Sequence, residues 1–149
     1  MRVADKNYIM EYAKIWHNKP MHMSAAYKIL THLVEQPLYN LQRLSFASIK
    51  RITDSDLNDY DIMSITMSIA LVSGLLEIKH ELIDGDDQID IDAEEIKSAE
   101  QSGYLVHPIT GREVHDYKSH VFIYFEYSSM LSYMKESDSN ESGSVEALL

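Results

Sequence analysis

The chain contains no cysteine among its 149 residues, and it has only five glycines and three prolines. Without cysteine it can form neither a disulfide nor a thiolate metal site. No apolar run approaches the roughly 20 residues that a membrane-spanning helix needs, and the first seven residues lack the apolar core of a signal peptide. We therefore expect a soluble protein of a reducing compartment, located in the cytoplasm.

Patterns that indicate catalysis are also missing. The chain has no cysteine nucleophile, no serine in a nucleophile-elbow context, and no glycine-rich loop for phosphate. The carboxylates lie on polar segments, where a raised pKa is not expected. We therefore expect no enzymatic activity and no cofactor.

Histidines and carboxylates near the end of the sequence raise the question of a metal site. Imidazole and carboxylate suit zinc or iron, and this region offers His107, Glu113, His115, Asp116 and His120. Their spacing matches no recurrent ligand pattern, so we expect no metal site.

Positive charge is scarce in the second half of the chain. Residues 1–75 hold eight Lys/Arg and seven Asp/Glu, whereas residues 76–149 hold five and seventeen, and the formal net charge is −11. Such an acidic half repels nucleic-acid phosphates, and it favours either basic protein partners or simple solubility.

The remaining sequence indicates a folded globule with helices first and strands later, since 45% of its residues are hydrophobic and ten are tyrosines. Apolar periodicity and capping residues predict helices at 5–17, from about 24 to before Pro37, 46–52, about 57–73, about 93–101 and 129–134. Alternation predicts strands at 76–83 and 88–92 around an Asp84–Gly85 turn, with Glu77, Lys79 and Glu81 on the polar face of the first strand. An apolar run predicts a strand covered on both faces at 121–125. Extended backbone is expected at 104–107.

Three details of these elements depend on single residues. Ser45 is expected to cap the third helix, and Asp92 with Glu95 forms a capping box for the fifth. Inward stripes are predicted at Tyr8, Ile9, Tyr12, Ile15 and Trp16 in the first helix, and at Met23, Tyr27, Leu30, Leu33 and Val34 in the second.

The segment from Ser64 to Ile78 is the most distinctive part of the sequence. It reads as an apolar helix that is closed by Gly74 and runs directly into a strand. Helical spacing predicts a core stripe at Ile62, Ile65, Ile69 and Val72. The opposite ridge carries Met63, Met67 and Leu71, flanked by Ser64.

Residues 21–92 resemble winged helix-turn-helix domains, which have three helices followed by a two-stranded wing. The resemblance is carried by the turn at Asp54, the Asp84–Gly85 hairpin, and an apolar set: Phe46, Ile49, Ile52, Ile62, Ile65, Ile69 and Gly74–Leu76. It implies an α+β fold with a three-helix core and a wing hairpin, to which this chain adds an N-terminal helix and a C-terminal strand element. We expect one such domain over residues 1–134 and a flexible acidic tail over residues 135–149.

The resemblance also implies either DNA binding or protein contact. The segment that would read DNA has no Arg, Lys, Asn or Gln on its outer ridge, and Asp59 and Asp61 stand at its start. The nearest cations are Arg43, Lys50 and Arg51.

We therefore expect an adaptor or accessory subunit that binds protein through Met63, Ser64, Met67 and Leu71, or through the acidic hairpin, although the same ridge could instead be core. The alternatives are a dimeric DNA-binding regulator that uses Arg43, Lys50 and Arg51, and a protein that mimics nucleic acid.

Overall fold

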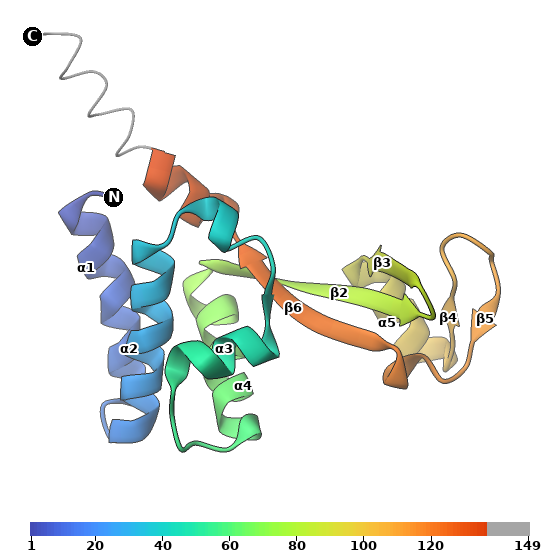
Figure 1. Cartoon of the computed structure of the whole chain (residues 1–149), viewed down its shortest axis with the longest axis horizontal. Helices are drawn as coiled ribbons and strands as arrows, with labels where there is room; N and C mark the ends of the chain where they lie inside the picture. The colour runs from blue at the N-terminus through green and yellow to red at the C-terminus, as the bar shows by residue number, and fades with distance from the viewer. Residues whose placement is uncertain (137–149) are drawn as a thin grey trace, which may run out of the picture. The chain divides into compact units, whose positions relative to one another are not determined.

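The protein has an α+β fold, and the computed structural model describes residues 1–136 (Figure 1). Its first half is helical: α1 (Val3–Glu11), η1 (Tyr12–Trp16), α2 (Pro20–Glu35), η2 (Leu38–Asn40), β1 (Leu44–Ser45), α3 (Phe46–Thr53), α4 (Asp59–Ser68) and η3 (Ile69–Ser73). The second half contains β2 (Leu76–Asp84), β3 (Asp87–Ile91), α5 (Ala93–Ser102), β4 (Leu105–Val106), β5 (Glu113–Val114), η4 (Tyr117–Ser119) and β6 (Val121–Tyr127), followed by a helix at 129–136.

These elements form two compact units. The first contains Met1–Glu77 and the described residues from Phe125 onward, and the second contains Ile78–Tyr124. The expected domain over residues 1–134 thus contains two units. Strands β2 and β6 run from one unit into the other, in a sheet of strand order β1-β6-β2-β3, and β4 pairs with β5.

The core of the first unit lies among α2, α3 and α4, which pack pairwise, with α1 and η1 against α2. α2 begins at Pro20, four residues before the predicted start, because proline is well suited to the first helical position. The fully buried residues of these three helices are Ala25, Ala26, Ile29, Leu30, Leu33, Ile49, Thr53, Ile62, Ile65 and Thr66, and Ile69 of η3 is buried as well. Burying each of the larger aliphatic side chains contributes roughly 1.5–3 kcal/mol to folding.

The predicted stripe of the first helix is only partly correct. Ile9 is buried together with Ala13, whereas Tyr8 and Ile15 are exposed. The helix tightens to 3₁₀ geometry from Tyr12, with three residues per turn, and this rotates Ile15 away from the expected face. The hydroxyls of Tyr8 and Tyr12 bond each other at 2.9 Å outside the core.

A π-helical turn, η3, follows α4 and changes which side chain is buried. The predicted core residue Val72 is 58% exposed, while Ser73 is 5% exposed. A turn with i→i+5 hydrogen bonds holds more residues than an α-helical turn, so the inward position moves from Val72 to Ser73. Gly74 then ends the helix with a φ of 70°, as its left-handed backbone requires.

The second unit is built on the predicted hairpin, which is confirmed. β2 and β3 pair antiparallel with Leu82 opposite Ile89, and Gly85 takes a φ of 62° in the turn. The amide of Glu95 donates to the Asp92 carboxylate at 2.8 Å, so the predicted cap of α5 is also confirmed. The core of this unit contains Leu82, Ile91, Ala99, Leu105, Val114 and Tyr117.

Two strand predictions were wrong in detail. Glu81, expected to face solvent, is buried and accepts a hydrogen bond from Gln88 Nε2 at 2.9 Å, which compensates for its lost hydration. Phe122 in β6 is exposed, so that strand is not covered on both faces along its whole length.

The helix at 129–136 includes the first two residues of the predicted tail. Lys135 Nζ donates to the carbonyl oxygens of Val34 at 3.1 Å and Gln36 at 2.7 Å, at the C-terminal end of α2. These bonds satisfy carbonyls that lack helical partners, and the partial burial lowers the pKa of Lys135. The rest of the tail prediction, residues 137–149, lies outside the described residues.

Candidate binding surfaces

The predicted partner-binding ridge lies on α4 and η3 and is partly exposed. Leu71 is 72% exposed and Ser64 is exposed, whereas Met63 and Met67 are half-buried. Sequence reasoning missed Tyr60, which is exposed and shares helical spacing with Ser64, Met67 and Leu71. We call the set Tyr60, Met63, Ser64, Met67, Leu71 and Val72 the α4 surface.

Acidic groups lie at the start of the α4 surface, and basic side chains from other helices lie close to them. Lys50 Nζ lies 2.9 Å from Asp59 Oδ1, and His22 Nε2 lies 3.8 Å from Asp61 Oδ1. The segment Asp59–Ser73 contains no lysine or arginine. The α4 surface is therefore apolar and uncharged beyond its first turn.

The three basic residues expected to contact DNA in the alternative function do not lie on one surface. Lys50 is paired with Asp59 and lies 5.9 Å from the centroid of the Phe46 ring. Arg43 and Arg51 instead line a separate groove, where Arg51 Nη2 donates to Ser48 Oγ at 3.2 Å. Only two of the three predicted phosphate contacts thus share a surface.

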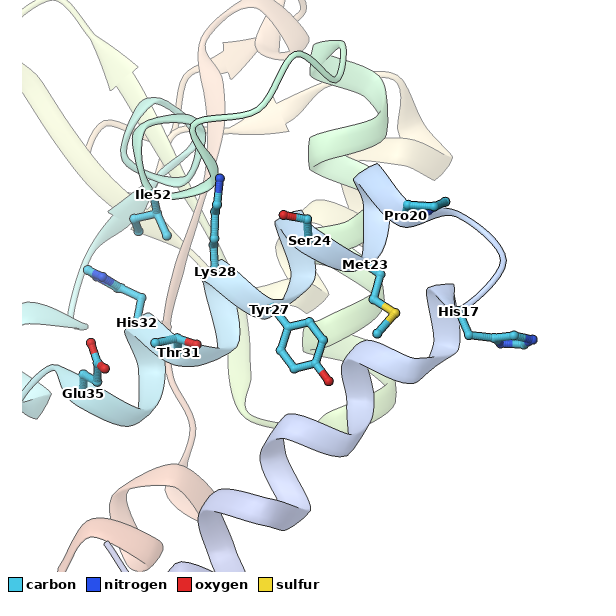
Figure 2. A pocket seen from close by; sticks show the side chains of 10 residues that line it. All are labelled: His17, Pro20, Met23, Ser24, Tyr27, Lys28, Thr31, His32, Glu35 and Ile52. Atoms are coloured by element: carbon cyan, nitrogen blue, oxygen red, sulfur yellow. The ribbon is translucent and has the colours of Figure 1, made fainter.

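A groove runs along the outer side of α2, and Figure 2 shows the side chains that line it. The groove has two parts. The part drawn in Figure 2 has a volume of about 720 Å³ and is mainly apolar, with Pro20, Met23 and Tyr27 from α2 and Ile52 from α3. A second part of about 450 Å³ shares His32 and Ile52 with the first, and it includes Arg43, Ser48 and Arg51. We call the two parts together the α2 groove.

Sequence reasoning missed the α2 groove because it assigned Met23 and Tyr27 to the core. Both side chains are half-buried, and the fully buried positions on α2 are Ala25, Ala26, Ile29, Leu30 and Leu33. The available signal was the spacing of Pro20, Ser24, Tyr27, Thr31 and Glu35, which places them along one face of a helix. A polar–apolar mixture on one helix face is typical of a half-exposed groove.

Lys28 and His32 are two titratable residues that line the groove. Lys28 Nζ donates to the carbonyl oxygen of Thr53 at 2.9 Å, which satisfies the C-terminal end of α3. Burial lowers the pKa of His32, and the nearby Glu35 carboxylate opposes this shift only in part. His32 is therefore neutral at pH 7.

The histidines considered as metal ligands have other partners. His107 is buried, and its Nδ1 accepts hydrogen bonds from the amides of Ile109 and Thr110, each at 3.2 Å. His115 bonds Glu113 at 3.0 Å, and His120 bonds Asp116 at 3.0 Å, which lowers the pKa of Asp116. Over residues 1–136, no three side chains of metal-binding type gather into one site.

Comparison with known proteins gives no relative, since no family model, curated protein or solved structure matches this chain. Within the described part of the chain, no helix combines the length and the apolarity needed to cross a membrane.

Proposed function

We propose that the protein is a non-enzymatic adaptor or accessory subunit that binds a partner protein through the α4 surface. The observation that carries this proposal is the exposure of Leu71, Val72 and Tyr60 on one helix and its final turn. Exposed apolar side chains grouped in this way are typical of protein-binding sites. The order of α2, α3, α4 and the β2–β3 hairpin is also the order that the winged-helix resemblance implies.

The methionines of the α4 surface and the net charge of the chain indicate which kind of partner surface would fit. Met63 and Met67 are flexible and half-buried, so they can adapt to an apolar surface while remaining anchored in the helix packing. The chain carries a net charge of −11, which favours a partner whose contact is apolar at its centre and basic at its rim. A second copy of this chain is a less suitable partner, because it is acidic and not basic.

DNA binding is the weaker alternative. Base readout needs side chains such as Arg, Asn or Gln on the presented helix, and the α4 surface has none. Lys50 is paired with Asp59, so binding phosphate with it requires breaking an existing ion pair. Mimicry of nucleic acid is the other alternative, and it is favoured by the eleven Asp/Glu against four Lys/Arg in Ile78–Tyr124.

Site-specific photo-crosslinking tests the main proposal. A benzoylphenylalanine residue is placed at Leu71 in the full chain, in cells of its natural host, and Ile109 serves as the control site because both side chains are 72% exposed. We expect one protein to crosslink at position 71 and not at position 109. Mass spectrometry of the crosslinked product identifies it.

The purified partner then gives a quantitative test. Leu71→Asp places a charge in the apolar contact and should weaken binding by about tenfold or more, whereas Ile109→Asp should have no effect. Because Leu71 is exposed, both variants should keep the wild-type melting temperature. Crosslinks only to a second copy, crosslinks to DNA, or equal binding by the two variants would contradict the proposal.

A further inference from the structure

The α2 groove is a second surface with a different character from the α4 surface. Its apolar part lies along α2 between η1 and α3, as Figure 2 shows by the positions of His17 and Ile52 on either side of Tyr27. Its other part continues past His32 to Arg43 and Arg51. α2 has 16 residues and is therefore about 24 Å long, enough to lie beside a peptide helix of similar length.

The charges of the groove are arranged unevenly. Among residues 1–136, no aspartate or glutamate lines the part that contains Arg43 and Arg51, and Glu35 lines the apolar part. His32, between the two parts, is neutral at pH 7, and the Lys28 ammonium is bonded to the end of α3. The groove therefore has a positive end, although the net charge of the chain is −11.

We propose that the α2 groove binds an acidic, amphipathic segment of a partner protein. The apolar side chains of that segment pack on Met23, Tyr27 and Ile52, and its carboxylates lie beside Arg43 and Arg51. Laying an apolar helix face into a groove is a common mode of peptide recognition, and opposite charges at one end fix the direction of the peptide. This site goes beyond the proposed function, because it uses neither Leu71 nor any other residue of the α4 surface.

Two synthetic peptides test the proposal with the full chain. Each has 16 residues and leucines at helical spacing, and the remaining positions are mainly Glu in one and mainly Lys in the other. Neither contains tryptophan, so Trp16, the single tryptophan of the chain and the neighbour of groove residue His17, reports binding by its fluorescence. We expect the Glu peptide to bind and to change this fluorescence, and the Lys peptide to bind at least about tenfold more weakly.

Charge reversal at the positive end gives the matched comparison. The double variant Arg43→Glu/Arg51→Glu should weaken binding of the Glu peptide by about tenfold or more. The control Lys97→Glu/Lys118→Glu makes the same charge change at exposed residues outside the groove, and it should leave affinity within about twofold. All four substituted residues are exposed, so circular dichroism should match the wild type. Leu71→Asp should bind the Glu peptide normally, which separates this site from the α4 surface.

Several outcomes would overturn the proposal. Equal binding of the two peptides, or equal weakening by the two double variants, would remove the role of Arg43 and Arg51. A doubling of mass in sedimentation that is abolished by Arg43→Glu/Arg51→Glu would make a second copy the occupant. Displacement of the Glu peptide by a synthetic peptide with the sequence of residues 137–149, at similar concentration, would assign the groove to this chain instead of a partner.

Discussion

His32 illustrates how position within a helix sets the chemistry of a single residue. It lies where the two parts of the α2 groove meet, and partial burial disfavours its charged form. In a titration followed by NMR, the pKa of His32 should fall below the ordinary histidine value of 6.5. A midpoint at or above 6.5 would mean that the ring is solvated or paired with Glu35.

The same shift predicts a dependence of stability on pH. Because the folded pKa of His32 is lowered, the unfolded chain takes up the proton first as the pH falls below 6.5, and the folded state loses stability until its own pKa is passed. His32→Gln should therefore reduce the loss of stability between pH 6.5 and pH 5. Urea unfolding at several pH values measures this, and an unchanged slope would contradict the prediction.

Predictions about single residues succeeded where the interaction joins residues that are close in the sequence. Ser45 accepts a hydrogen bond from the Ser48 amide at 3.2 Å, and Asp92 caps α5, because an N-cap depends only on residues a few positions away. The cap of α4 is Asn58, whose Oδ1 accepts from the Asp61 amide at 2.8 Å, and it was missed among the preceding polar residues. Burial of Glu81 could not be predicted, since it depends on which elements cover β2.

At the scale of elements, periodicity located the helices and the hairpin but not departures from regular geometry. The 3₁₀ segment at Tyr12–Trp16 and the π-helical turn at Ile69–Ser73 each rotate the side chains that follow. A fixed angle of 100° per residue therefore assigned Ile15 and Val72 to the core. The same assumption hid the α2 groove, because one apolar stripe was taken as wholly inward.

Alanine substitutions at Val72 and Ser73 test the π-helical turn directly. Ser73 Oγ donates to the Ile69 carbonyl and accepts from the Leu75 amide at 3.1 Å, and all three residues are buried. Ser73→Ala leaves these backbone groups without their partner and should cost about 1–3 kcal/mol. Val72→Ala removes an exposed side chain and should cost less than about 0.5 kcal/mol. Chemical denaturation of both variants measures the difference, and the reverse order would indicate a regular α-helix.

For the whole molecule, the distribution of charge is the property that the sequence predicts most directly. The net charge and the excess of acidic residues in the second half follow from the amino-acid sequence. The location of Arg43 and Arg51 in one groove, and of Lys50 beside Asp59, is known only from the folded structure. Pairing of this kind depends on residues from separate helices, α3 and α4. It decides how many of the few cations can reach a phosphate backbone.

This distribution predicts that the full chain binds generic duplex DNA weakly. Non-specific affinity comes mainly from Lys and Arg contacts with phosphates, and here the hairpin that would serve as a wing carries Asp84, Asp86, Asp87 and Asp90. Fluorescence anisotropy with a random 30-base-pair duplex at about 0.15 M salt should give no submicromolar binding. The same titration at about 0.02 M salt serves as the control, because any affinity that rests on phosphate contacts must rise steeply there. Submicromolar affinity at 0.15 M salt that falls further as salt is added would favour the DNA-binding regulator over the adaptor.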